Sequence, residues 1–429
     1  MAEHVFTGFG FGPIQAGLFV KEAFQSGNFT RIVTAEVDQQ LVDAVRANDG
    51  SYYVNVAKTN GVEALKIDGV ELLNPTDAGD RRILREVLTK ATEMATCLPS
   101  VDFYDSGGAS SVASLVGDGL TKSGAQGTII YTAENNNHAA ELLEEAVTER
   151  MGTLAGRNVQ FLNTVIGKMS RVVTDSGEIA DAKLVTIAPG IERAFLVEEF
   201  NRILVTRAKV SGFRPGIEVF IEKDDLLPFE EAKLYGHNAV HALLGFVGAV
   251  KGHNKMTELK EDAAVMQMGR DAFLNECGAA LIRKYADLRD ELFTDAGFGD
   301  YSEDLLERMT NPYLGDTVAR VCRDVVRKLG VNERIFGTMR LALEHGIEPK
   351  NMALGAMAGI AVLLKRPDEN RLPSNLHFGD WRRLDIAGIE RIINWIWKER
   401  KGQYSRRLIQ YVQSARERLI EVTMDPGGP

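Results

Sequence analysis

A largely apolar helical stretch near the middle of the chain contains Lys233, His237, Asn238 and His241. At about 100° per residue, Asn238 lies about 140° and His241 about 80° round an α-helix from Lys233, so they share one broad side. A lysine in apolar surroundings needs a partner or a lowered pKa, and lysines of this kind serve as general bases. The alternative is a lysine that extends to solvent beside two histidines of the core.

The helix that carries these residues begins at Pro228. Proline suits the first turn of a helix, and Glu230 and Glu231 suit the positive end of its dipole. The residues from there to Ala249 are mostly apolar and compatible with a helix. We therefore expect most of this helix to be buried.

A second group of residues, near the N-terminus, is suited to binding a dinucleotide. The sequence predicts a strand at Val5–Thr7, a glycine turn at Gly8–Gly12, a helix at Ile14–Ser26 and a strand at Arg31–Ala35. In this order the turn brings the backbone close to a pyrophosphate, and the helix N-terminus faces the phosphates. A tight turn without a ligand is the alternative.

Glu36 follows the second predicted strand, where a dinucleotide fingerprint has the acid that binds the ribose. Its charge would repel a 2′-phosphate, which favours NAD over NADP. The fingerprint is incomplete, because Gln15 stands in place of the third glycine and Gly17 follows it.

Asn135 follows another predicted strand, Thr128–Ala133, within the run Glu134-Asn135-Asn136-Asn137. A cluster of asparagines at the end of a strand is ordinary turn chemistry. The residues alone therefore do not separate a turn from a binding site.

The spacing Lys233-x4-Asn238-x2-His241 resembles the signature of the polyol-specific long-chain dehydrogenases. This family includes mannitol dehydrogenases, mannitol-1-phosphate 5-dehydrogenases and hexuronate reductases. The Glu134-Asn135 step is similar to the second catalytic element of the family, and the stretch from Asn311 to Leu329 looks most like the mannitol-1-phosphate dehydrogenases. The resemblance implies an α/β Rossmann domain followed by an all-α domain, with the active site in the cleft between them.

The resemblance also implies roles for the site residues. Lys233 would be the general base, Asn135 and Asn238 would polarise the substrate oxygen, and His241 would orient Lys233 or a substrate hydroxyl. The expected reaction interconverts mannitol 1-phosphate, or a related hexitol phosphate, and fructose 6-phosphate with NAD and without a metal. The expected cofactor contacts are Gly8, Gly10, Gly12, Ile14, Gln15, Glu36, Thr96 and Asn135.

Two features bear on which members of this family the chain resembles most. Arg320, Arg323 and Arg327 have the spacing of one helical face and are candidates for binding a substrate phosphate, although a solvated face has the same pattern. Gly167 and Lys168 stand where relatives commonly carry an Asp-Arg step. We assign no function to these two residues.

Composition limits the remaining possibilities. A chain of 429 residues predicts two domains, which we place at 1–224 and 225–429. Its 50 basic and 60 acidic residues give a net charge of −10, which argues against nucleic acid and anionic membranes as partners. Three widely separated cysteines are typical of a reduced, cytoplasmic protein, and we expect a monomer or a small homo-oligomer.

Three alternatives remain open. One is a dehydrogenase of unphosphorylated mannitol or a hexuronate reductase. A second is a metal-dependent alcohol dehydrogenase, because His237 and His241 have the spacing of a helical ligand pair, although no third ligand is evident. The third is a non-catalytic NAD-binding sensor, which would not need a base.

Overall fold

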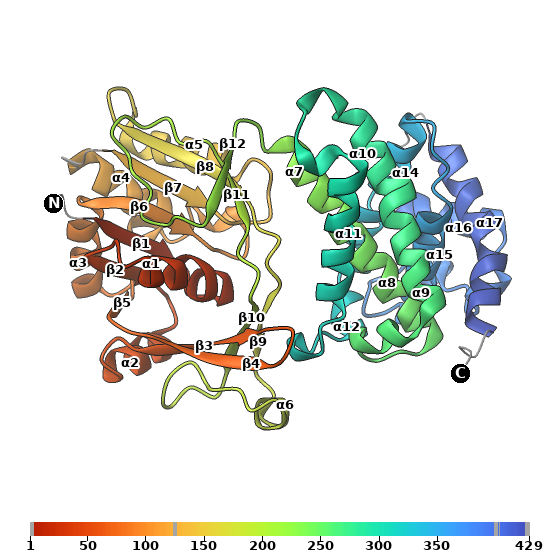
Figure 1. Cartoon of the computed structure of the whole chain (residues 1–429), viewed down its shortest axis with the longest axis horizontal. Coiled ribbons are helices and arrows are strands. Elements are labelled where there is room, and N and C mark those ends of the chain that lie inside the picture. The colour runs from red at the N-terminus through yellow and green to blue at the C-terminus, as the bar shows by residue number, and fades with distance from the viewer. Residues whose placement is uncertain (1–3, 123–126, 399–401, 403, 425–429) are drawn as a thin grey trace. The chain divides into compact units, whose positions relative to one another are not determined.

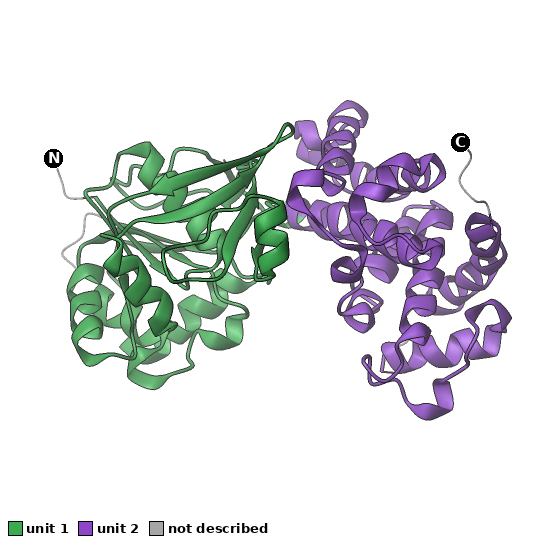
Figure 2. Cartoon of the chain, turned by 90° about the horizontal axis from the view of Figure 1, so that it is seen from below, with its two compact units in different colours: residues 1–227 green, residues 228–429 purple. Residues whose placement is uncertain are grey.

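The computed structural model describes residues 4–122, 127–398, 402 and 404–424. The chain divides into two compact units, Met1–Leu227 and Pro228–Pro429 (Figure 2). The predicted boundary lies three residues before this division. The position of an active site relative to both units stays a prediction.

The first unit contains a sheet in the order β12-β11-β8-β7-β6-β1-β2-β5 (Figure 1). The segment β5-β2-β1-β6-β7-β8 is parallel throughout and has the strand order of a dinucleotide-binding fold. The strands are β1 Val5–Phe9, β2 Arg31–Ala35, β5 Val70–Leu73, β6 Ala91–Thr96, β7 Thr128–Thr132, β8 Val159–Val165, β11 Ile203–Thr206 and β12 Phe220–Lys223.

Two apolar cores lie on opposite faces of this sheet because the side chains of each strand alternate. From β1, Phe6 belongs to one core, while Val5 and Phe9 belong to the other. The first core includes residues of η1 (Gln15–Val20), α1 (Lys21–Ser26) and α2 (Gln39–Ala47). The second includes residues of α3 (Ala78–Leu88), α4 (Val112–Lys122) and α5 (Ala139–Met151).

A smaller sheet in the order β4-β3-β10-β9 packs against the first core. Its close approach to the first helix depends on Gly17. A Cβ atom there would lie 2.6 Å from Cγ1 of Val197 in β10. The strands are β3 Tyr52–Ala57, β4 Val62–Ile67, β9 Ser170–Val173 and β10 Ala194–Glu198, and α6 (Ser176–Asp181) follows β9.

The elements of regular structure in the second unit are all helices among its described residues, joined by loops and one isolated β-bridge. Its elements are α7 Leu227–Glu231 at the boundary, η4 Ala232–His237, α8 Asn238–Lys251, η5 Met256–Glu261, α9 Ala263–Asp271, η6 Ala272–Gly278, α10 Ala279–Lys284, η7 Ala286–Leu288, η8 Glu291–Phe293, α11 Asp295–Met309, η9 Pro312–Leu314, α12 Val318–Val321, α13 Val325–Lys328, α14 Arg334–Glu344, α15 Lys350–Lys365, η10 Ser374–Leu376, η11 Trp381–Arg383, α16 Ile386–Ile396 and α17 Ser405–Met424.

The core of the second unit is the pair α8 and α15, which are almost wholly apolar and lie along each other (Figure 1). Glycines allow the two helices to approach closely. A Cβ atom at Gly355 would lie 2.8 Å from Cδ1 of Leu243, and one at Gly359 would lie 3.1 Å from the ring of Phe246. This contact holds the helix that begins at Asn238.

In the described part of the chain, π-helical turns occur at η1, η4 and η6. Such turns are rare and occur frequently at functional sites. The first follows the glycine turn, and the second carries Lys233. Among the described residues, no helix has both the length and the apolar character that crossing a membrane requires.

Candidate active site

A cleft of about 660 Å³ lies in the first unit at the carboxyl ends of β1, β2, β6 and β7. The neighbours of β1 are reached by chain crossovers in opposite directions, which makes this the topological switch point where such sheets bind ligands. Its lining includes Gly10, Gly12, Ile14, Glu36, Thr76 and Ala133.

The glycine turn has two residues with different constraints. Gly10 has φ +79°, and a Cβ atom there would lie 2.7 Å from the carbonyl oxygen of Cys97. At Gly12 a Cβ atom would meet nothing within 4 Å, so the space in front of the following helix is open. This arrangement leaves room for a phosphate at the helix N-terminus. Gly8 does not belong to the turn as predicted, because it pairs with Thr34 and Ala95 inside the sheet.

Gln15, in place of the third glycine, is buried beneath the turn. A Cβ atom at Gly8 would lie 1.8 Å from its Nε2 atom, so the amide of Gln15 occupies the space above that glycine. Neither polar atom of this amide has a hydrogen-bond partner among the described residues. The prediction that Gln15 contacts the cofactor therefore applies only to its main chain, whereas Ile14 lines the cleft.

Glu36 stands at the end of β2 as predicted, and two main-chain groups hold its carboxylate. Oε2 accepts a hydrogen bond from the Phe11 N–H at 2.7 Å, and Oε1 accepts one from the Asp38 N–H at 2.9 Å. A carboxylate can accept further donors, so these contacts orient Glu36 without exhausting it. Its contact with a ribose stays a prediction.

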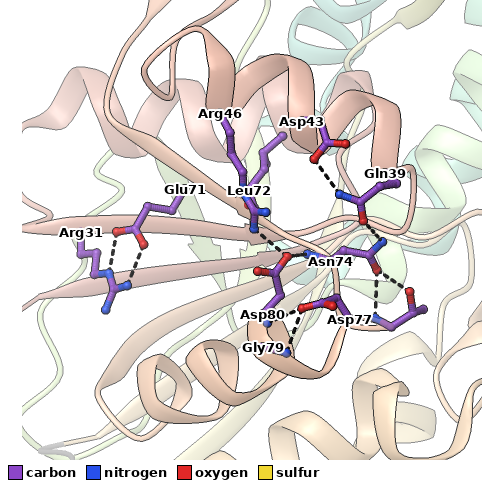
Figure 3. A network of polar contacts seen from close by, with 11 residues as sticks. Arg31, Gln39, Asp43, Arg46, Glu71, Leu72, Asn74, Asp77, Gly79 and Asp80 are labelled. Atoms are coloured by element: carbon purple, nitrogen blue, oxygen red, sulfur yellow. Dashed lines mark hydrogen bonds and ion pairs between the residues drawn. The ribbon is translucent and has the colours of Figure 1, made fainter.

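A polar network fixes the turn after β5 that borders this cleft (Figure 3). The carboxylate of Asp80 accepts hydrogen bonds from Arg46 at 2.6 Å and from the Asn74 N–H at 2.7 Å. The Asn74 side chain donates to Gln39 at 2.7 Å and accepts from the Thr76 N–H at 2.9 Å. These bonds position Thr76 at the rim.

Glu134 holds the ends of β6 and β7 together. Its carboxylate accepts hydrogen bonds from the Thr96 hydroxyl and the Leu98 N–H, each at 2.8 Å, and from the Tyr104 hydroxyl. Burial first, and then the charge of Glu134, raise the pKa of Tyr104. The Thr96 hydroxyl, predicted to contact the cofactor, is thus occupied by Glu134. Asn135 follows with an exposed side chain that bonds to no other described residue.

Lys233 and Asn238 are related by a π-helical turn instead of the predicted α-helical spacing. The Asn238 N–H donates to the Lys233 carbonyl, five residues back. The predicted separation of about 140° is therefore wrong, because an i→i+5 bond places Asn238 one full turn beyond Lys233. The structure brings the two residues onto one side more closely than an α-helix would.

The amine of Lys233 has an unusual environment. Burial and, to a smaller extent, the positive charge of Arg334 lower the pKa of Lys233 to about 8. The negative charge of Glu230 opposes both effects. Arg334 is the first residue of α14 and is itself buried. A lysine with this pKa has a sizeable neutral fraction near neutral pH, as a general base requires.

His237 and His241 follow on the same side, with ring centroids 6.3 Å apart. Burial, and then the charge of His241, lower the pKa of His237 well below its ordinary value. Nε2 of His241 lies 3.4 Å from Oδ2 of Asp316, whose Oδ1 accepts from Arg320 at 2.9 Å. Burial raises the pKa of Asp316, but His241 and Arg320 outweigh it and hold the pKa below its usual range.

The three arginines do not share a helical face. Arg320 lies on α12, which ends at Val321, and Arg327 lies on the separate helix α13. Asp324 between them has the left-handed φ of 56°, which interrupts the helix. Arg320 is paired with Asp316, and Arg323 and Arg327 are exposed. The predicted common helical face is therefore wrong, and a contact of these arginines with a substrate phosphate stays a prediction.

Lys168, in the replaced Asp-Arg step, is buried and donates to the main-chain carbonyls of Glu198 and Phe200. It therefore holds the end of β10 and has no place in the cleft. Among the described residues, no three His, Cys, Asp or Glu side chains are grouped as metal ligands.

Comparison with known proteins shows which proteins this chain is similar to. Residues 225–375 match the mannitol dehydrogenase C-terminal domain. The mannitol-1-phosphate 5-dehydrogenase of Halalkalibacterium halodurans is 26% identical over 366 residues, 84% of this chain and 89% of that protein. The one from Brevibacillus brevis is 28% identical over 358 residues, 82% of this chain and 84% of that protein.

Two solved structures share the whole architecture. A substrate-free D-sorbitol dehydrogenase has a TM-score of 0.76 at 15% identity, covering 98% of this chain and 94% of that one. The Pseudomonas fluorescens mannitol 2-dehydrogenase, in complex with NAD and D-mannitol, has a TM-score of 0.64 at 18% identity, covering 99% and 93%. The predicted α/β unit followed by a helical unit is confirmed, and the chain is similar over most of its length to proteins of the mannitol dehydrogenase family.

Proposed function

We propose that this protein oxidises mannitol 1-phosphate to fructose 6-phosphate with NAD, and catalyses the reverse reaction, with Lys233 as the general base. The observation that carries the proposal is the Lys233–Asn238 pair, in which a half-buried amine of pKa about 8 lies one π turn from an amide. The two bacterial relatives, both mannitol-1-phosphate 5-dehydrogenases by name, support the phosphorylated substrate.

The chain is an NAD-dependent polyol dehydrogenase, in agreement with its family domain and with relatives named for that activity. The cleft of the first unit fits the cofactor. It combines an open space at Gly12, a helix N-terminus and an oriented carboxylate at Glu36.

Oxidation of a secondary alcohol removes a proton from oxygen and a hydride from carbon. NAD, when bound, accepts the hydride. Neutral Lys233 takes the hydroxyl proton and becomes an ammonium, and in the reverse direction it returns that proton to the ketone oxygen. The amide N–H groups of Asn238 and Asn135 are the proposed donors to the same oxygen, where negative charge develops.

The phosphate needs a cation, and the structure favours Arg334 over the three predicted arginines. Its side chain is only 10% exposed and has an ion pair with the adjacent Glu333 at 2.8 Å. The Thr338 hydroxyl contacts the carbonyls of both Arg334 and Tyr235, so the first turn of α14 is fixed against η4. A cation at a helix N-terminus is disfavoured by the dipole, and a bound anion would relieve that cost.

The main alternative is an unphosphorylated polyol, since the two solved neighbours act on D-sorbitol and D-mannitol according to their names. A hexuronate is a further candidate, because its carboxylate would also suit Arg334. The discriminating experiment measures NAD reduction with mannitol 1-phosphate, mannitol, sorbitol and hexonates, which are the alcohols that a hexuronate reductase would oxidise. We expect mannitol 1-phosphate to exceed free mannitol at least about tenfold in kcat/KM, which needs about 1.4 kcal/mol of differential binding. Comparable rates with free mannitol would remove the phosphate from the proposal.

The same panel tests Arg334. Arg334→Gln should lower the ratio of kcat/KM for mannitol 1-phosphate over mannitol by about tenfold. The ratio is the proper readout, because any effect of Arg334 on Lys233 alters both substrates alike. Arg323→Gln, a change at an exposed arginine of the same unit, is the matched control and should leave the ratio unchanged.

A further inference from the structure

A buried carboxylate stands behind His241. Oδ2 of Asp316 lies at an ion-pair distance of 3.4 Å from Nε2 of His241, and that nitrogen is buried and has no hydrogen-bond partner among the described residues. The His241 side chain as a whole keeps 19% of its surface exposed, whereas that of Asp316 keeps 6%. The ring therefore presents Nε2 to the carboxylate in the interior, and its exposed part lies elsewhere on the ring.

The main chain around Asp316 is bonded to the segment at residues 254–256. Its carbonyl accepts from the Met256 N–H at 3.0 Å, and the Val318 N–H donates to the Asn254 carbonyl at 2.9 Å. An isolated β-bridge between Lys255 and Thr317 joins the same two segments. The second carboxylate oxygen accepts from Arg320 at 2.9 Å. With main chain and side chain both fixed, Asp316 offers His241 a permanent negative acceptor.

Such an acceptor selects one tautomer of a neutral imidazole. A carboxylate accepts a proton but cannot donate one when ionised, so the nitrogen facing it carries the hydrogen. The proton of His241 then resides on Nε2, and Nδ1 keeps a lone pair. A lone pair at Nδ1 can accept a hydrogen bond from a hydroxyl, which an Nδ1–H group cannot do.

We propose that Asp316 is a positioning residue that locks His241 in the Nε2–H tautomer, so that Nδ1 accepts a hydrogen bond from a hydroxyl of the polyol. This inference rests on the proposed function, because it gives His241 a partner on the substrate. It explains why Arg320 is directed at Asp316 and not at a phosphate. It also means that the substrate must carry a hydroxyl group opposite Nδ1 of His241. A polyol has such a group, whereas a substrate with a methylene group at that position does not.

The direct test is Asp316→Asn. The amide keeps the size of the carboxylate but can present N–H to Nε2, which favours the opposite tautomer; in serine proteases the same exchange leaves geometry intact and lowers turnover strongly. We expect kcat to fall at least about tenfold, with NADH affinity and the melting temperature nearly unchanged. Asp324→Asn is the matched control, because Asp324 is exposed and its left-handed φ of 56° suits asparagine.

Two further measurements separate positioning from a merely structural role. In a double-mutant cycle, Asp316→Asn should change kcat by less than about twofold once His241 is alanine, because it acts through that ring. ¹⁵N NMR of the histidines, of which the chain has seven, should show His241 protonated at Nε2 in the wild type and altered in Asp316→Asn. The NMR result on the wild type remains decisive if the variant fails to fold.

An Nδ1–H tautomer in the wild type, or additive effects in the cycle, would overturn this inference. Its failure is distinguishable from failure of the proposed function. Lys233→Ala without loss of turnover would remove the proposed base, whatever the tautomer of His241. A normal rate for Asp316→Asn together with an inactive Lys233→Ala would remove only the role of Asp316.

Discussion

The two units provide binding groups of different kinds. In the first unit the cleft combines apolar side chains with open space at Gly12 and with the Glu36 carboxylate, which two main-chain N–H groups orient. In the second unit the proposed site consists of ionisable side chains, with the pKa of Lys233 lowered by burial and by Arg334. Changes in the first unit should therefore alter cofactor affinity, whereas changes in the second should alter turnover and its pH dependence.

The largest expected effect is in the second unit. Lys233→Ala should lower kcat at least about a hundredfold, the usual contribution of a positioned base, while NADH binding stays nearly intact. Steady-state kinetics and fluorescence titration with NADH measure the two quantities. Lys260→Ala, an exposed lysine of the same unit, is the control. A variant with near wild-type turnover would remove Lys233 as the base.

The corresponding change in the first unit is at the glycine turn. Gly12→Ala should weaken NAD binding at least about tenfold without loss of thermal stability, because its Cβ enters open space that the cofactor needs. Gly10→Ala should also lower the melting temperature, because φ is +79° and the Cβ would lie 2.7 Å from a carbonyl. Equal stability losses for both would contradict this distinction.

A smaller effect is expected at Glu36. Glu36→Ser should narrow the preference for NAD over NADP, because it removes a carboxylate that repels a 2′-phosphate. The measurement is the ratio of kcat/KM for the two cofactors, with kcat itself little changed. Equal use of both cofactors by the wild type would show that Glu36 does not face the ribose.

The smallest effect concerns stability. Glu276 is buried and accepts hydrogen bonds from the Asn351 and Met352 N–H groups at the start of α15. Burial raises its pKa to about 7, so the native state keeps a proton that the unfolded state loses above its ordinary pKa of about 4.5. Stability should therefore fall as pH rises from about 4.5 to 7, and Glu276→Gln should reduce this slope. Denaturant unfolding across that range would measure it, and an unchanged slope in the variant would exclude Glu276 as its source.

The two units also differ in how far the sequence predicts them. The strand Arg31–Ala35 and the helix end before Gly27 were predicted correctly, because local signals determine them. The position of Glu36 follows from that strand. The prediction that Gly8 belongs to the glycine turn is wrong. Glycine is required at this position because the side chain of Gln15 fills the space that a Cβ atom would occupy. Only tertiary contact shows such a requirement.

In the second unit periodicity alone was insufficient. A π turn leaves no mark in a pattern read at α-helical spacing, so the i→i+5 relation of Lys233 and Asn238 was missed. The helix break at Asp324, which has a left-handed φ of 56°, is likewise not visible in a pattern of arginines at helical spacing. Asp316 was missed as a site residue because its link to His241 spans 75 residues, although an acid four residues before an arginine was a visible signal.

The central claim is that Lys233 must be neutral to accept the proton during oxidation. The pH dependence of the hydride-transfer rate, measured in single-turnover experiments with saturating NAD and mannitol 1-phosphate, tests this most directly. The rate should rise tenfold per pH unit at low pH and level off through an apparent pKa of about 8. A rate independent of pH between 6 and 9, with deuterium substitution at the reacting carbon confirming that hydride transfer is observed, would contradict the assignment.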